Sequence, residues 1–242
     1  MADLAPAGQV RQRGDGRVTF TCGANTLTLI ISGMGPKKAM GAAQAALDDA
    51  QDQARVRKTR PAKADVVLVI GLCGGLAESL SEGRIVAYTN CLSTDPTRPP
   101  IPTNPEFTSR IVQVLASSNI RCDQVRGFTS PRIATNREHR LRLAQTGATA
   151  VDMETYAVLA AAARAGIPAV VLRVVSDSLD RELPDLNRAL TVDGALDGRK
   201  ALGVAIGSPL RTLRLLAANK RAMQKLGDAL RIVLPSDCFD VG

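Results

Sequence analysis

The amino-acid sequence predicts a single α/β domain in which a mixed, largely parallel central sheet is flanked by helices. Three observations support this fold class. Strand-like segments alternate with helix-like segments after residue 60, and some of the strands are short apolar runs such as VVLVIGL at 66–72. No linker or internal repeat divides residues 1–242. Parallel strands joined by helical crossovers give this alternation.

The first third of the chain is expected to hold two strands before its first helix. Residues 17–33, RVTFTCGANTLTLIISG, form two β runs around a Gly-Ala-Asn turn. A Gly-rich turn and a proline then begin an Ala-rich helix over about residues 36–54. Buried strands are predicted at 66–72 and 84–90.

The remaining elements continue the alternation. The Pro-rich segment 93–105 is too rigid and too polar for the core and is predicted to be a loop. The last third of the chain, residues 197–234, is predicted to be mostly helical. Between them, helix and strand are expected to alternate, beginning with a helix, over residues 106–118, 121–130, 136–147, 148–153, 154–166 and 168–178.

Composition indicates an ordinary globular protein of 242 residues, with 45% hydrophobic and 22% charged residues. No apolar run reaches the ~18–20 residues that span a bilayer, and residues 1–17 lack the apolar segment of a secretory signal. The five cysteines are scattered and form no CxxC pair, which argues against a disulfide framework or a zinc site. We therefore expect a cytoplasmic location.

The net charge of +8 is compatible with nucleic-acid binding, an anionic surface or simple solubility. The basic residues are spread along the chain, apart from a cluster at 55–63, and aromatic residues make up 2% of the sequence. Stacking platforms for bases are therefore scarce. A solvated basic surface is favoured over nucleic-acid binding, which stays open as an alternative.

Two Gly-rich turns, SGMGPK at 32–37 and GLCGGL at 71–76, follow predicted strands. Ligands of open α/β sheets bind beyond the carboxyl ends of strands, so both turns are well placed for a binding role. Neither turn matches a dinucleotide-binding or P-loop motif. Tight backbone packing would explain the glycines equally well.

Four charged residues, Asp152, Glu154, Arg173 and Asp177, lie within or beside the apolar stretch 150–178. Carboxylates in such surroundings are costly unless they are paired, and they often serve chemistry. GLCGGL after a strand, VDMET opening a helix and RVVSD closing the next strand together resemble the purine nucleoside phosphorylase and nucleosidase superfamily.

The resemblance covers nearly the whole chain. SGMGPKKA is similar to the family's first Gly turn, whereas residues 1–16 match poorly and are expected to be truncated or disordered. The ending, LRVVSDSLDRELPD followed by SPLRTLRLLAANKRAMQKLGDAL, is most similar to the hopanoid-biosynthesis-associated nucleosidase branch.

The resemblance implies that Met153 and Glu154 hold the ribose of a nucleoside. Methionine packs on the sugar, and glutamate accepts hydrogen bonds from the 2′- and 3′-hydroxyls. A carboxylate there would also stabilise the positive charge that develops on the ribose in the transition state. The alternatives are a core methionine and an acidic residue favoured in the first turn of a helix.

The resemblance also implies that Asp177 protonates, or hydrogen-bonds to, N7 of the departing purine, with Ser176 orienting it. A partly desolvated strand end can raise the pKa of an acid as this task requires. Arg173 would organise the carboxylates, although a purely structural ion pair is equally compatible with it. For Asp177 the alternative is a cap at the end of the strand.

Gly33, Gly35, Gly74 and Gly75 are assigned to the substrate pocket, and Asp152 to a structural role. No metal or organic cofactor is implied. Two more residues are expected to have no catalytic part. Cys73 is expected to be a small buried side chain. His139, in the charged segment REHRLR, is expected to be solvated.

The sequence departs from the family pattern in two places. In the hydrolases of the family, a glutamate near the start of the chain activates the attacking water molecule. Residues 1–17 contain no glutamate, so the general base is unassigned. The phosphorylases hold phosphate with an arginine and a serine, where this chain has Val69 and Leu72. This apolar pair favours hydrolysis over phosphorolysis.

We therefore predict an enzyme, an N-ribosyl hydrolase acting on a purine nucleoside that bears adenine, and the hopanoid-like ending suggests an adenosyl-hopanoid. A phosphate-dependent phosphorylase and a catalytically impaired nucleoside-binding protein are the alternatives. The resemblance implies a homo-oligomer, with a dimer as the expected form. The basic amphipathic segment 209–226 is predicted either to contact an anionic membrane surface or to pack on the sheet.

Overall fold

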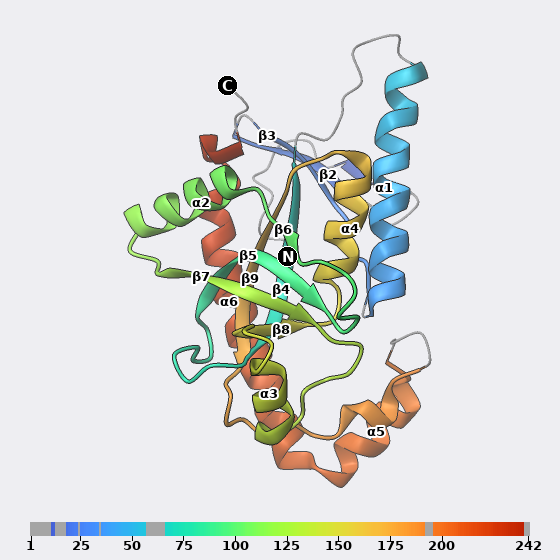
Figure 1. Cartoon of the computed structure of the whole chain (residues 1–242), viewed down its shortest axis with the longest axis vertical. Helices are drawn as coiled ribbons and strands as arrows, with labels where there is room; N and C mark the ends of the chain where they lie inside the picture. The colour runs from blue at the N-terminus through green and yellow to red at the C-terminus, as the bar shows by residue number, and fades with distance from the viewer. Residues whose placement is uncertain are drawn as a thin grey trace.

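The central sheet of the computed structural model closes on itself (Figure 1). Its strands are arranged in the order β6-β5-β7-β8-β4-β9, and β9 also pairs with β5. The structure describes residues 11–12, 18–23, 25–33, 35–56, 66–191 and 196–239. The six strands of the sheet are β4 (Val67–Gly75), β5 (Ile85–Ser93), β6 (Ile101–Pro102), β7 (Cys122–Thr129), β8 (Ala150–Asp152) and β9 (Ala169–Asp177).

The predicted mixed sheet is confirmed by the strand pairings. β5 with β7, β7 with β8, and β4 with β9 are parallel. β4 with β8, β5 with β6, and β5 with β9 are antiparallel. Every residue of β9 is buried, because this strand is paired on both sides and covered on both faces.

Helices alternate with the strands in the predicted order (Figure 1). Asn104 and Asn136 begin two of them by accepting hydrogen bonds from the backbone N–H groups of Phe107 and His139. Gly166 ends a third in the left-handed conformation, with φ of 65°. The helices are α1 (Pro36–Val56), α2 (Pro105–Ser117), α3 (Arg137–Ala144), α4 (Thr155–Ala165), α5 (Gly198–Gly207) and α6 (Pro209–Val233).

The hydrophobic core has two main parts, one on each side of the sheet. Helices α2 and α6 pack on one side, where Ile111, Leu115, Leu226 and Leu230 are almost fully buried against β9. Helix α4 packs on the other side, through Leu159 and the buried residues around it. The central strands are therefore packed on both faces.

A separate three-stranded antiparallel sheet contains β1 (Arg11–Gln12), β2 (Val18–Cys22) and β3 (Asn25–Leu29). The predicted β runs around a turn are thus confirmed. The side chain of Asn25 donates hydrogen bonds to the carbonyls of Leu234 and Ser236, at 2.8 and 3.1 Å, and so ties this sheet to the end of α6.

Two expectations fall largely outside the described residues. The first concerns residues 1–16, of which the structure describes only the short strand β1, a strand that the sequence did not predict. The second concerns the basic cluster at 55–63, which is not described beyond residue 56.

One detail of the prediction is corrected. The Pro-rich loop 93–105 contains β6, whose residues pair with Asn90 and Cys91 at the edge of the sheet, a position that tolerates proline. The C-terminal third is mostly helical, as predicted, and the chain bends by 115° between α5 and α6. By length and composition, no single helix of the described chain could span a membrane, and only this bent pair passes when taken together.

Candidate active site

A cavity of about 450 Å³ lies where strands β4, β8 and β9 end. Its wall includes the segment after β3, the end of β4, the loop after β7, the β8–α4 junction and the end of β9. Ligands of α/β sheets bind at such ends. The predicted site residues that line it are Gly33, Gly74, Met153, Glu154, Arg173, Ser176 and Asp177.

A bulge in β9 brings Ser176 and Asp177 to the cavity together. Cys73 of β4 pairs with Val175, but the next residue, Gly74, pairs with Asp177, so Ser176 is the extra residue. Neighbouring side chains of a regular strand point to opposite faces, and a bulge breaks that alternation. Both side chains are buried and line the cavity.

Asp177 is held through both of its carboxylate oxygens. Oδ1 accepts a hydrogen bond from the Ser176 hydroxyl at 2.5 Å. Oδ2 lies 2.6 Å from Nη2 of Arg140, whose side chain is 0% exposed. Burial raises the pKa of Asp177 above its usual value, while the Arg140 guanidinium and the Ser176 hydroxyl act in the opposite direction.

Ser176 can serve both protonation states of Asp177. Its hydroxyl lies within hydrogen-bonding distance of Asp177 Oδ1 and, at 3.2 Å, of the Cys73 carbonyl. When the carboxyl is ionised, the hydroxyl donates to it. When Oδ1 carries the proton, that proton can be donated to the Ser176 oxygen while the hydroxyl donates to Cys73.

Arg140 is a residue of the site that the sequence did not reveal. It belongs to α3, a helix of charged residues, but is completely buried. Its Nε donates to the Ala134 carbonyl at 2.9 Å, and its Nη1 donates to the Ser178 carbonyl. These bonds fix the guanidinium against Asp177. The sequence carries no signal for this contact, because the neighbours of Arg140 in α3 are exposed or half-buried.

Glu154 connects the first Gly-rich turn to the cavity. Its Oε1 accepts a hydrogen bond from the Gly35 backbone N–H at 3.0 Å. Burial raises the pKa of Glu154, whereas the Gly35 N–H and the Arg173 guanidinium oppose the rise. Gly35 does not itself line the cavity. It acts on the site through the carboxylate that it holds.

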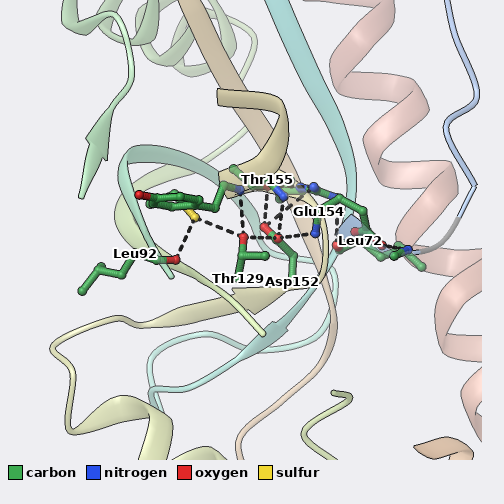
Figure 2. Close-up of polar contacts among 10 residues, drawn as sticks. Leu72, Leu92, Thr129, Asp152, Glu154 and Thr155 are labelled. Atoms are coloured by element: carbon green, nitrogen blue, oxygen red, sulfur yellow. Dashed lines mark hydrogen bonds and ion pairs between the residues drawn. The ribbon is translucent and has the colours of Figure 1, made fainter. Parts of the chain in front are cut away.

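Asp152 holds the start of α4 (Figure 2). Its Oδ1 accepts from the backbone N–H groups of Glu154 and Thr155, at 3.0 and 2.9 Å, and from the Thr129 hydroxyl at 3.0 Å. Its Oδ2 accepts from the Thr155 hydroxyl at 2.5 Å. These contacts cap the helix and use both oxygens, in line with the structural role expected for Asp152.

Arg173 joins β9 to this network. Its Nη2 donates to the Thr155 hydroxyl at 2.7 Å and lies 3.7 Å from Asp152 Oδ2, and its Nη1 donates to the Leu72 carbonyl at 3.2 Å. A Cβ on Gly71 would lie 2.5 Å from Nη1, and Gly71 has a φ of +153°. The close approach of this guanidinium therefore requires glycine at position 71.

The remaining predicted residues differ in their contact with the cavity. Met153 and Gly74 line it, and a Cβ on Gly74 would lie 2.8 Å from Asp177 Oδ2. Gly75 does not line it. A Cβ there would lie 2.8 Å from the Leu80 carbonyl, so Gly75 allows a close backbone contact. Gly33 lines the cavity in the left-handed conformation, with φ of 74°.

Cys73 and His139 are the two side chains that were expected to take no part in the chemistry. Cys73 is buried, and burial raises the pKa of its thiol, which disfavours the nucleophilic thiolate. His139 does not line the cavity and is half-buried rather than fully solvated. Burial and the nearby arginines lower its pKa.

Within the described residues, the carboxylates that line the cavity are Asp152, Glu154 and Asp177. Asp152 is occupied by the helix, which leaves one acid beside Ser176 and another beside the Gly-rich turn. In the part of the chain that is described, no three His, Cys, Asp or Glu side chains are grouped so as to hold a metal ion. Carboxylates placed in this way can transfer protons and stabilise positive charge.

Comparisons with known proteins identify the family and the fold. A family model described as the phosphorylase superfamily matches residues 3–196. No curated protein matches the chain by sequence. The fold is similar to that of the 5′-methylthioadenosine/S-adenosylhomocysteine nucleosidase of Neisseria meningitidis, solved with methylthio-immucillin-A, with a TM-score of 0.69 and 15% identity over 97% of this chain and 92% of that one.

Two further solved structures have the same fold. The futalosine hydrolase of Helicobacter pylori has a TM-score of 0.66 and 15% identity, over 93% of this chain and 87% of that one. The S-adenosylhomocysteine nucleosidase of Streptococcus pyogenes, solved with 5-methylthiotubericidin, has a TM-score of 0.60 and 20% identity, over 95% of this chain and 89% of that one.

Proposed function

The chain belongs to the phosphorylase superfamily, and we propose that it is an N-ribosyl hydrolase that cleaves the N-glycosidic bond of a purine nucleoside. One observation carries the proposal. Glu154 and Asp177 line the same cavity, where burial raises the pKa of Asp177, and the Gly35 N–H and the Arg173 guanidinium oppose the rise that burial causes in the pKa of Glu154. The family match and the nucleosidase and hydrolase structures of the same fold support it.

Asp177 is proposed to act as the general acid toward N7 of the purine. Its raised pKa keeps a proton available nearer to neutral pH than an exposed aspartate could. Since Oδ2 faces Arg140, the transferred proton is placed on Oδ1, beside Ser176. The Ser176 hydroxyl is proposed to orient Oδ1 of Asp177. It donates a hydrogen bond to Oδ1 when Asp177 is ionised and accepts one when Oδ1 carries the proton.

Glu154 is proposed to bind the ribose hydroxyls and to stay negative beside the sugar. As the glycosidic bond breaks, positive charge grows on the ribose, and a fixed carboxylate stabilises that state more than the ground state. The hydrogen bond from Gly35 holds one oxygen in place. Met153, which lines the cavity next to Glu154, would pack on the sugar.

Hydrolysis is favoured over phosphorolysis by two apolar residues of β4. Val69 and Leu72, which stand where the phosphorylases hold phosphate, both line the cavity. Apolar side chains cannot compensate for the desolvation of a phosphate dianion. The guanidinium of Arg173 already serves Thr155 and the Leu72 carbonyl.

We propose adenine as the base and a large apolar group at the 5′ position, as in an adenosyl-hopanoid. The cavity wall supports the apolar 5′ group, because apolar side chains make up much of this wall, among them Leu29, Ile30, Ile133 and Leu183. Ile31, also in the wall, is 76% exposed and would meet a substituent that leaves the cavity. The homodimer and the cytoplasmic location stay predictions.

The test is release of the free base from a panel of nucleosides, with and without phosphate. Adenosine, inosine and 5′-alkylthioadenosines of increasing chain length are the substrates. We expect phosphate-independent release of adenine that becomes faster as the alkyl chain lengthens. Turnover only with phosphate would indicate a phosphorylase, and calorimetric binding of adenine without turnover would indicate a binding protein. Either result would overturn the proposal.

A further inference from the structure

Large exposed apolar side chains are concentrated on one corner of the molecule. Eight such side chains are exposed among the described residues, and all but two of them lie between Leu196 and Leu216. This corner, formed by α5 and the first turns of α6, stands at one end of the molecule, beyond α3 (Figure 1). The exposed side chains of the α5–α6 corner are Leu196, Leu202, Ile206, Leu210, Leu213 and Leu216, at 40, 62, 72, 69, 63 and 59%.

The residues that the structure describes do not bury these side chains. Helix α5 has no buried residue, although its sequence, GRKALGVAIG, is largely apolar. In α6 the buried residues begin only at Ala218. A helix turns by about 100° per residue, so Leu213 and Leu216 lie on the side facing away from Ala218 and Ala222. An exposed apolar patch of this kind marks an interaction site.

The charge around the corner favours one type of partner. Between residues 198 and 217 the chain has four basic residues, Arg199, Lys200, Arg211 and Arg214, and no acidic residue. All four are exposed, and Arg211 is paired with Glu182 at 2.5 Å. A second copy of this chain would present the same positive charge across a two-fold interface, which disfavours self-association. A bilayer surface, in which anionic headgroups lie over apolar acyl chains, complements both the basic and the apolar side chains of the corner.

We propose that the α5–α6 corner attaches the protein to the surface of an anionic membrane, with its leucines and isoleucines among the acyl chains and its basic residues at the headgroups. The attachment is peripheral. The second half of α6 is packed in the core through Leu226, Leu230 and Val233, which are at most 2% exposed. This half cannot leave the domain to enter a bilayer.

Hydrogen bonds through a short helix also connect the α5–α6 corner to the wall of the cavity. Leu190 and Leu196 form a β-bridge, and the Asp197 N–H donates to the Ala189 carbonyl at 2.7 Å, which joins α5 to the short helix η2 (Leu186–Ala189). Within η2, the Asn187 side chain exchanges two hydrogen bonds, both of 2.9 Å, with the backbone of Ile133 in the cavity wall. The membrane proposal does not depend on the proposed hydrolysis, because it is read out by binding alone.

The experiment is flotation of the full chain with vesicles of phosphatidylcholine, with or without about 30% phosphatidylglycerol. We expect binding to the anionic vesicles, weakened by high salt, and little binding to the neutral ones. The variant Leu202→Gln/Ile206→Gln/Leu213→Gln should weaken the partition constant by about tenfold or more. The single change Leu213→Gln should weaken it measurably, whereas Leu141→Gln, on the 38% exposed Leu141 of α3, should not.

A charge-matched pair of variants separates this corner from the net charge of the protein. Arg199→Glu/Lys200→Glu/Arg214→Glu should weaken binding to anionic vesicles by about tenfold or more. The control Arg98→Glu/Arg121→Glu/Arg142→Glu changes the net charge equally, on side chains that are 60, 71 and 62% exposed elsewhere. It should stay within about twofold of the wild type.

Three results would overturn the proposal. One is a wild-type chain that does not bind anionic vesicles, and another is an equal loss of binding in the charge control. The third is a wild-type oligomer, detected by light scattering, that the glutamine substitutions convert to a monomer while vesicle binding is absent. In that case the corner is an interface between copies of this chain.

Discussion

Replacing Asp177 by asparagine tests the chemistry and the stability of the site together, because its partner Arg140 is fully buried. The two charged atoms lie 2.6 Å apart, and the side chains are 0 and 11% exposed. Removing one partner of a buried ion pair leaves an uncompensated charge and costs about 3–5 kcal/mol. We expect the lower end, about 3 kcal/mol, because the Ala134 and Ser178 carbonyls still accept from Arg140.

A double-mutant cycle separates the two effects. Asp177→Asn/Arg140→Met contains no buried charge at this point, so its loss of stability should be smaller than the sum of the two single losses by about 2–3 kcal/mol. The rate of base release should behave differently. It should fall about 10²–10⁴-fold in Asp177→Asn, the contribution of a general acid, and remain low in the double variant.

Urea denaturation measures the stabilities and adenine release measures the rates. Domains of this kind are stable by about 5–15 kcal/mol, so each variant should still fold. An unchanged rate in Asp177→Asn would remove Asp177 from the mechanism. A coupling energy near zero would show that the ion pair does not hold the site together.

The remaining predictions concern the pH response, the sugar side of the site and its glycine. In Arg140→Met the pKa of Asp177 should rise further above the value of an unfolded chain, so the native state holds its proton to higher pH. The stability deficit should then grow as the pH rises through the range in which Asp177 ionises, and urea titrations over a series of pH values that show the opposite trend would refute this. Glu154→Gln should keep the hydrogen bond from the backbone but reduce kcat/KM by about 10²–10³-fold, with melting temperature as the control. Gly71→Ala should destabilise by about 1–3 kcal/mol through its strained φ and displace Arg173, whereas Gly41→Ala, in open space in α1, should be neutral or stabilising in the same urea titration.

The resemblance to the family, which short motifs carry, allowed most of the candidate site to be predicted. VDMET and RVVSD place their charged residues where a helix begins and a strand ends, and such junctions face the ligand side of an α/β sheet. For that reason Met153, Glu154, Arg173, Ser176 and Asp177 all line one cavity.

The sequence could not show contacts between residues that are far apart in the chain. The Gly35 N–H meets Glu154 across 119 residues, and Arg140 meets Ser178 across 38. Arg140 is one of three arginines in REHRLR, and no periodic pattern marks it as buried, since the rest of α3 is exposed or half-buried. From the sequence, segment 209–226 could either contact a membrane surface or pack on the sheet. In the structure the second half of α6 is packed in the core, and its first turns belong to the exposed α5–α6 corner.

The sequence by itself determined the alternation of strands and helices and the residue types at their ends, because these depend on local periodicity and turn chemistry. Only the tertiary structure decided that the sheet closes through β5 and β9, that Arg140 faces Asp177, and that the α5–α6 corner is left uncovered. Each of these depends on which distant segments are packed together, and burial and charge pairing across such distances leave no mark on any single stretch of the chain.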